Sequence, residues 1–174
     1  LRYFTANAWS STPVSHKDVL AELCASRYGE SAEQMKAAWE MALPASWLRD
    51  WDGNCVRAIL TFGGAGMNSA KRIAAWKKPV EAACGAFNAL QNVQWSDPFV
   101  KRDAIDIVRM VLDRLISLRI WEFSCDYFKW RSNRTDGHLS SGANAAEAIS
   151  GRRLIARAAT VAALCAKMAA LLAL

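Results

Sequence analysis

The stretch PFVKRDAIDIVRMVLDRLISLRIWEFSCDYFKW, residues 98–130, decides the fold of this chain. Its apolar residues recur at spacings of three and four, and they fill more than one face of the helix that this spacing predicts. Ile105 lies on one of these faces and Ile107 on another, while the charged residues keep to a narrow stripe. A helix that is apolar on several sides is mostly buried. The sequence therefore predicts a long, mostly buried helix that opens at Asp97-Pro98.

The charged residues of this stretch are spaced for ion pairs within the helix. Arg102 precedes Asp106 by four residues, and Arg109 precedes Asp113 by four. Side chains four apart are neighbours on a helix, and an exposed pair of this kind contributes roughly a few tenths of a kcal/mol. Asp103 and Asp106 also lie early in the helix, where a carboxylate offsets the macrodipole. We therefore assign these carboxylates a structural role rather than a catalytic one.

Two helices are predicted before this stretch. Ser15 followed by Asp18 forms a capping pattern for a helix that stops at Gly29. Ser31 repeats the pattern for a second helix, which Pro44 ends because proline lacks an N–H and clashes with the preceding turn. The two helices therefore meet close to Gly29.

The rest of the chain has the same helical character. Ser69 caps a short helix that Pro79 interrupts, and an apolar stripe continues over residues 80–90. Residues 131–142 are polar and aperiodic, which predicts an exposed loop before a last helix that starts near Asn144. That helix is rich in alanine and apolar on one face, and we expect this face to have a neighbour outside the sequence.

The fold class follows from these segments. Every periodic segment has helical spacing, and no stretch alternates as a half-buried strand does. We therefore predict an all-α protein, an irregular multi-helix bundle or array without significant sheet. Residues 1–174 form a single helical domain in this interpretation, and its hydrophobic core buries Trp39 and Ile105.

Composition and charge narrow the classes of function. Hydrophobic residues make up 53% of the chain and charged residues 22%, so the chain is neither disordered nor fibrous. Its net charge of +6 would attract polyanions, but the basic residues are spread singly or in pairs among acids. We therefore predict no specific binding of nucleic acid. The most apolar run, residues 154–174, contains Arg157 and Lys167, which indicates a packed helix rather than a membrane span.

Residues that could carry chemistry are sparse. The five Cys include no C-x-x-C pair and have no His nearby, which predicts mostly buried thiols, no metal site and no cofactor. The two histidines, His16 and His138, lie far apart and without a nucleophile constellation, so we assign no catalytic residue in this chain. Asn133 begins an N-glycosylation sequon in the polar loop, a pattern that chance explains equally well.

Several short motifs agree in order and spacing with one enzyme family. They are Ala-Trp at residues 8–9, Pro-Val at 13–14, ASRYG at 25–29, Ala-Trp at 38–39 and RDAIDIVR at 102–109. In these motifs the chain resembles glycoside hydrolase family 89, the α-N-acetylglucosaminidases. The matching region is the start of the family's C-terminal helical domain.

This resemblance implies a fragment of a larger C-terminal domain that follows a catalytic barrel. The parent enzyme would remove terminal α-linked N-acetylglucosamine from glycans with two glutamates of the barrel, neither of which is in this chain. The segment alone would be inactive and would support the barrel, its intramolecular partner. Tyr3 and Trp9 lie nearest in sequence to the barrel site, so they are nominated for contact with the substrate. Such an enzyme would be secreted, periplasmic or lysosomal.

Two alternatives stay open at this point. One is a noncatalytic helical domain that docks a protein partner through the apolar face of its last helix. The other is the helical domain of a different carbohydrate-active enzyme, such as an α-glucuronidase. Only the sequence of the upstream barrel would separate this last alternative from the first interpretation.

Overall fold

The computed structural model describes residues 7–8, 11–46, 69–135 and 143–172. These residues form helices and no strand, which confirms the predicted all-α class for the described part of the chain. The elements are, in chain order, α2 His16–Tyr28, the 3-10 turn η1 Gly29–Ser31, α3 Ala32–Ser46, α5 Ser69–Ala83, α6 Ala86–Ala89, the 3-10 turn η2 Leu90–Asn92, α7 Pro98–Thr135 and α8 Ala143–Leu172.

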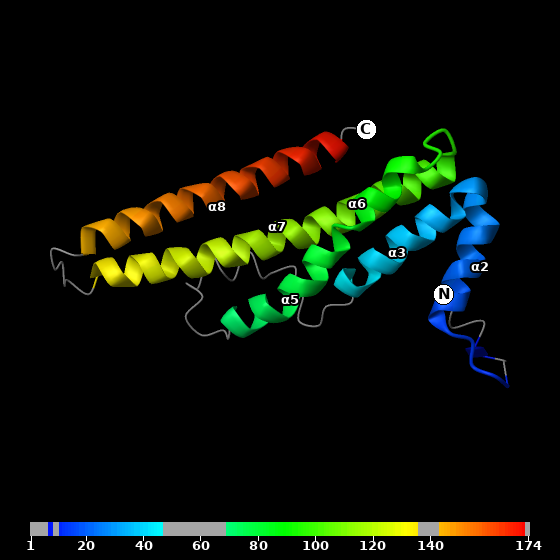
Figure 1. Cartoon of the computed structure of the whole chain (residues 1–174), viewed down its shortest axis with the longest axis horizontal. Coiled ribbons are helices and arrows are strands. Elements are labelled where there is room, and N and C mark those ends of the chain that lie inside the picture. The colour runs from blue at the N-terminus through cyan, green and yellow to red at the C-terminus, as the bar shows by residue number, and fades with distance from the viewer. Residues whose placement is uncertain (1–6, 9–10, 47–68, 136–142, 173–174) are drawn as a thin grey trace.

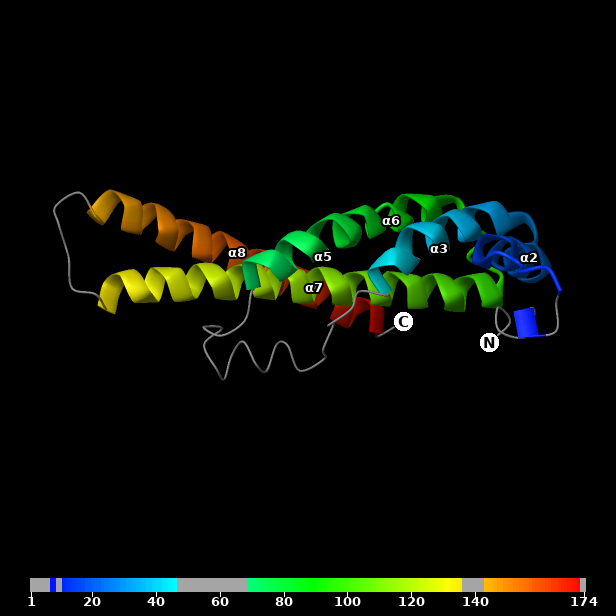
Figure 2. The same cartoon turned by 90° about the horizontal axis from the view of Figure 1, so that it is seen from below.

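Helix α7 is the element against which the other α-helices pack (Figure 1). α8 runs along one side of it, α3 and α5 pack on another, and α2 crosses the molecule near the start of α7. Figure 2 shows α3, α5 and α6 as a row on one side of α7. α7 is thus covered on several sides, as its apolar faces require.

The core lies between α7 and this row of helices. On α3, alanines at positions 38, 42 and 45 share one face and are completely buried. Because their side chains are short, the α3 backbone can approach its neighbours closely. The buried residues of α3, α5 and α7 that form the centre of the core are Met35, Ala38, Ala42, Ala45, Trp76, Val80, Ala83, Val100, Ala104, Ile107, Val111, Leu118 and Trp121.

One aromatic pair joins α5 to α7. The rings of Trp76 and Trp121 meet edge to face with centroids 5.9 Å apart. Edge-to-face pairs place the positive rim of one ring against the negative face of the other, which adds to the gain from burial. The Trp121 indole N–H is buried without a hydrogen-bond acceptor, so this contact is stabilised by packing alone.

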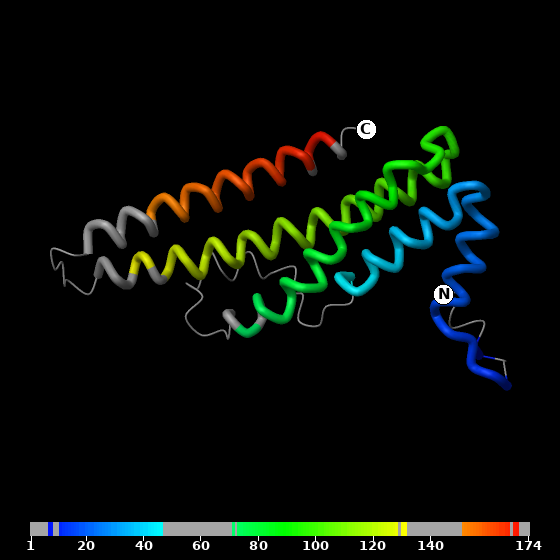
Figure 3. The backbone as a smooth tube through the Cα atoms, viewed as in Figure 1, coloured from blue at the N-terminus to red at the C-terminus, as the bar shows by residue number. Residues whose placement is uncertain are grey.

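The junction between α5 and α6 packs tightly against α3. The backbone continues from α5 through α6 and η2 before it reverses into α7 (Figure 3). Gly85 lies at this junction, and a Cβ there would come within 2.9 Å of Met41 Sδ and 3.1 Å of the Ala82 carbonyl oxygen. Glycine is therefore favoured by the close approach of the two helices.

The first predicted helix start and stop are confirmed. The Asp18 backbone N–H donates to Ser15 Oγ at 3.1 Å, and the Ser15 hydroxyl donates to the Asp18 carboxylate at 2.7 Å. Gly29 ends α2 with a φ of 50°, in the left-handed region that favours glycine. The cap predicted at Ser31 is wrong, because its hydroxyl instead accepts the backbone N–H of Gln94 at 2.8 Å.

Both predictions about proline were wrong. α3 continues through Pro44 to Ser46, and α5 continues through Pro79 to Ala83. A proline inside a helix removes one hydrogen bond. Ala45 and Val80, the residues that directly follow the two prolines, are fully buried, and their packing in the core offsets this loss. Residues 131–135 were predicted to lie in a polar loop but belong to α7, which extends to Thr135, and the rest of that predicted loop lies outside the described residues.

Trp39 and Ile105 are only half-buried, so their predicted full burial was wrong. Trp39 lies at the edge of the core, where its indole N–H reaches the hydroxyl of Tyr28 at 3.4 Å. α7 turns its Ile107 face inward instead, and Ile107 has no exposed surface. Val111, Leu118 and Trp121 on the same face are buried as well.

Truncation of the inward face of α7 should destabilise the protein strongly. Ile107→Ala removes a fully buried side chain and should lower the free energy of unfolding by about 2 to 5 kcal/mol. Ile155→Ala in α8 is the matched control, because Ile155 is 71% exposed and should change stability by less than about 0.5 kcal/mol. Urea denaturation followed by circular dichroism measures both, and equal effects would contradict the packing described.

Two glycines should respond to alanine in opposite directions. Gly151 lies inside α8 and a Cβ there meets nothing within 4 Å, so Gly151→Ala should stabilise by about 0.5 to 1 kcal/mol. Gly29→Ala should destabilise by about 1 kcal/mol, because its backbone has a φ of 50°. Thermal unfolding of the two variants checks the sign of each change.

Candidate functional site

Side chains from α2, α3 and α7 meet at the carboxylate of Asp103. Arg27 Nε donates to Asp103 Oδ2 at 2.6 Å, and the Tyr28 hydroxyl donates to the same oxygen at 2.8 Å. Arg102 Nε donates to the other oxygen, Oδ1, at 3.0 Å. The Trp39 indole N–H completes the group by donating to the Tyr28 hydroxyl at 3.4 Å. We call these five residues the Asp103 cluster.

Local structure brings the Asp103 cluster together. Arg27 and Tyr28 are the last two residues of α2, which Gly29 ends, and they lie 76 and 75 residues before Asp103 in the sequence. The Arg27 guanidinium also lies over the ring of Phe99, 4.8 Å from its centroid, in a cation–π contact. The cluster therefore fixes the end of α2 against the first turns of α7.

Burial and hydrogen bonds act in opposite directions on the pKa of Asp103. Burial alone would raise it, but hydrogen bonds from Arg27, Tyr28 and Arg102 outweigh that effect and hold the pKa below its usual value. Burial raises the pKa of Tyr28 to about 12, partly offset by the hydrogen bond from Trp39. At neutral pH Asp103 is therefore ionised, and Tyr28 keeps the proton that it donates.

The Asp103 cluster has the chemistry of a structural tie. A general acid needs a carboxyl with a raised pKa, and a nucleophile needs an oxygen free to attack. Both oxygens of Asp103 already accept hydrogen bonds, and its pKa is lowered. The cluster can hold α2 on α7, but this carboxylate is not set up to transfer a proton.

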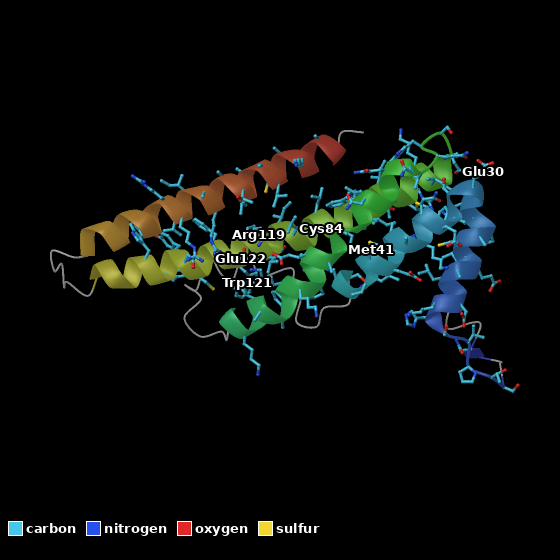
Figure 4. All side chains as sticks on the ribbon, viewed as in Figure 1. Glu30, Met41, Cys84, Arg119, Trp121 and Glu122 are labelled. Atoms are coloured by element: carbon cyan, nitrogen blue, oxygen red, sulfur yellow. The ribbon has the colours of Figure 1, made fainter. Side chains whose placement is uncertain are left out.

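A second set of charges links α5, α7 and α8 around Arg119 of α7. Arg119 donates to Glu122 at 2.7 Å and to Glu81 of α5 at 3.1 Å. Figure 4 labels Arg119 and Glu122 along the middle of α7. Burial would lower the pKa of Arg119, but its bonds to the two glutamates outweigh burial and raise it. The guanidinium therefore stays charged between the helices.

The same network continues from α7 to α8. Arg157 of α8 lies 3.6 Å from Glu122 and 3.0 Å from Asp126, and Arg153 lies 3.1 Å from Asp126. The two contacts to Asp126 Oδ2 are ion pairs without the angles of a hydrogen bond. Two successive turns of α8 are thus attached by charge to two successive turns of α7.

These carboxylates do not form the pair that a glycosidase needs. Such a pair combines an ionised carboxylate with a protonated one across the sugar. Glu122 and Asp126 instead share the guanidinium of Arg157, which lies 3.6 Å from the first carboxylate and 3.0 Å from the second, so both face a cation of the next helix. Within the described residues, no three His, Cys, Asp or Glu side chains gather to hold a metal ion. No helix in the described ranges has the length and apolarity needed to cross a bilayer.

Most of the residues nominated from the sequence lie outside the part of the chain that the structure describes. Tyr3 and Trp9, nominated for substrate contact, lie outside the described residues, and so does His138. Asn133 belongs to the last turn of α7 rather than to the predicted loop. The predicted loop position of Asn133 was therefore wrong, and a helix is not the exposed loop in which a glycosylation sequon is expected.

The predicted ion pairs of α7 form with different partners. Arg102 bonds its neighbour Asp103, and Arg109 lies 3.5 Å from Asp106, so neither arginine pairs with the acid four residues later. The predicted pairs are therefore wrong. Arg27 binds Asp103 from a distant part of the chain, and the Asp103 side chain is only 12% exposed, whereas the Arg102 side chain stays 65% exposed. The spacing of residues within one helix gives no sign of the bond between Arg27 and Asp103. The one signal in the sequence was that both residues lie in motifs of the resembled family, at residues 25–29 and 102–109.

The thiols are less buried than predicted. Of the described cysteines, all of them free, Cys24 is buried, Cys84 and Cys125 are half-buried, and Cys165 is exposed. Burial raises the pKa of Cys24 to about 11, so its thiol is not reactive at neutral pH. The prediction of mostly buried thiols holds for Cys24 alone.

The chain was compared with protein families, curated proteins and solved structures. No protein-family model, no curated protein and no solved structure matches the chain.

Replacement of Asp103 should weaken the protein in a pH-dependent way. Asp103→Asn removes the charge that Arg27 and Tyr28 bind, and should lower the free energy of unfolding at pH 7 by about 1 to 3 kcal/mol. Because the pKa of Asp103 is lowered on folding, its contribution is complete above the unfolded value of about 4. It is lost as the pH falls through the lower folded value.

Denaturation of the wild type and Asp103→Asn from pH 7 to pH 2 tests this account. The difference in stability should stay constant above about pH 5 and shrink below about pH 4. Tyr28→Phe is the control, since it removes one hydrogen bond, keeps the charge and should cost about 1 kcal/mol. A difference that persists unchanged at pH 2 would show that the carboxylate charge is not the stabilising element.

Proposed function

We propose that this chain is the helical supporting domain of a glycoside hydrolase similar to the α-N-acetylglucosaminidases of family 89. The parent enzyme removes terminal α-linked N-acetylglucosamine from glycans, and its catalytic glutamates lie on a barrel that precedes this segment. In this proposal the chain performs no chemistry. It forms a rigid body that holds the barrel, its intramolecular partner.

One observation carries the proposal. The residues of the resembling motifs are spread over the sequence, yet Arg27 and Tyr28, Trp39 and Asp103 come from three of these motifs and meet in one cluster. A chance similarity of short motifs gives no reason for their side chains to bond to one another. A shared helical domain does, because contacts between side chains of distant segments are what hold its helices together.

The chemistry of the described residues agrees with a supporting role. The carboxylates of buried Asp103 and of half-buried Glu122 and Asp126 are each paired with arginines. Ion pairs of this kind tie one helix to the next. A supporting domain needs such fixed positions, since a catalytic site works only when its surroundings are rigid.

A hydrolysis assay tests the proposal directly. The isolated chain should release no aryl alcohol from an aryl α-N-acetylglucosaminide, whereas the protein that includes the upstream barrel should release it. The parent protein should remain inactive toward an α-linked glucuronide, which separates it from an α-glucuronidase. Hydrolysis by the isolated chain, lost on substitution of one of its own acids, would contradict the supporting role.

Asp103→Asn in the parent protein distinguishes support from catalysis. A supporting residue leaves kcat per folded molecule within about twofold of the wild type, and it lowers the temperature at which activity is lost. A catalytic carboxylate would instead lower kcat by about a thousandfold or more without changing that temperature. Asp106→Asn is the matched control, because Asp106 is exposed and pairs only with Arg109 at 3.5 Å.

A second candidate function rests on the outer face of α8. Ile155 is 71% exposed, and many of the alanines around it are exposed as well. A noncatalytic interaction domain would use such a face to bind a partner helix. This alternative predicts that no hydrolytic activity accompanies the chain in any longer form of the protein.

A further inference from the structure

The side chain of Met41 fills the space beside a glycine of another helix. Met41 lies in α3, and its Sδ is the nearest atom to the place where a Cβ of Gly85 would stand, at 2.9 Å. Gly85 links α5 to α6, so the thioether packs directly on the junction of these two helices. Figure 4 labels Met41 where α3 passes this junction. The contact thus joins α3 to the turn between α5 and α6.

The residues next to this contact in the sequence are small and buried. Ala42 follows Met41 and has no exposed surface, and Ala83 and Ala86, on either side of Gly85, have none either. Short side chains let helices approach closely and leave little room for an added atom. A group at Met41 that is larger than the thioether, or that prefers water, therefore separates α3 from the junction.

The segment that follows Gly85 is held to α3 at two places. Met41 contacts Gly85 at one of them, and at the other the Gln94 backbone N–H donates to Ser31 Oγ, just before α3, at 2.8 Å. The second tie is a hydrogen bond that contains no sulfur. Loss of the Met41 contact should therefore loosen the later part of α3 and leave its start in place.

Met41 is open to solvent although it makes this contact. Of the methionines whose side chains the structure describes, Met41 alone is exposed, at 41%, whereas Met35 in the same helix has no exposed surface. A thioether reacts with a peroxide through a lone pair on the sulfur, and the sulfoxide that forms is polar. Exposure therefore makes Met41 the more reactive of the two methionines of α3.

We propose that Met41 is a peroxide-sensitive modification site, and that its sulfoxide separates α3 from the junction at Gly85. A lone pair of Met41 Sδ attacks one peroxide oxygen, the O–O bond breaks, and an S=O bond forms while water leaves. The sulfur loses two electrons and the peroxide gains them. The new oxygen is a polar group at the edge of an apolar contact, so it turns toward water and away from Gly85. A methionine sulfoxide reductase, with two thiols as the reductant, releases the oxygen as water and restores the thioether.

Treatment of the whole chain with hydrogen peroxide tests the proposal. It is carried out at pH 5, where thiols are protonated and react slowly, whereas a thioether has no proton to lose. Mass spectrometry should find sulfoxide at Met41 at least about tenfold faster than at Met35. The oxidised protein, returned to pH 7, should unfold at a midpoint roughly 4 °C lower, and the reductase should reverse this shift. Equal oxidation of the two methionines, or an unchanged midpoint after oxidation of Met41, would overturn the proposal.

Met41→Leu is the matched control variant, because leucine has a similar volume and no sulfur to oxidise. Its midpoint should not fall when it is treated with peroxide, and a fall as large as in the wild type would overturn the proposal by assigning the effect to another residue. Hydrogen exchange locates the change within the fold. Amides of α6 and of residues 39–46 should exchange faster after oxidation, whereas those of α2 should not. Equal acceleration in α2 would contradict a local separation at Gly85.

Discussion

A helix of 38 residues with apolar side chains on several faces cannot be stable alone in water, and the rest of this structure follows from that constraint. Each described α-helix packs against α7. The alanine face of α3 lets one neighbour approach closely, and the edge-to-face contact of Trp76 with Trp121 fixes another. Ion pairs then add further contacts between α7 and the two outer helices, α2 and α8.

The two charged groups have different consequences for function. The Asp103 cluster joins segments far apart in sequence and ties the end of α2 to α7, while a separate bond from Gln94 to Ser31 ties the turn before α7 to the start of α3. The network around Arg119 attaches α8, whose outer face stays open. Long-range hydrogen bonds therefore gather at the end where α2 meets α7.

The local parts of this structure could be predicted from the sequence. Ser15 and Gly29 bound α2 because a cap and a left-handed residue act within one turn, and the spacing of residues 98–130 gave α7. Two of the failures arose because a bond to a distant residue overrode a local rule. Ser31 bonds Gln94, 63 positions away, instead of capping α3, and Arg102 bonds Asp103, which Arg27 also binds from 76 positions away, instead of Asp106. No pattern within one helix contains that information.

The sequence separation within the Asp103 cluster also bears on how the chain folds. α7 and α8 are neighbours in sequence, so their contacts close only a short loop, whereas the bond from Arg27 to Asp103 closes one of 76 residues. The entropy lost in closing a loop grows with its length, at about 0.6 kcal/mol for each doubling. Contacts between distant segments are gained late unless something brings the ends together first. The charged tie between α2 and α7 closes a much longer loop than the contacts between α7 and α8, so we expect it to form after them.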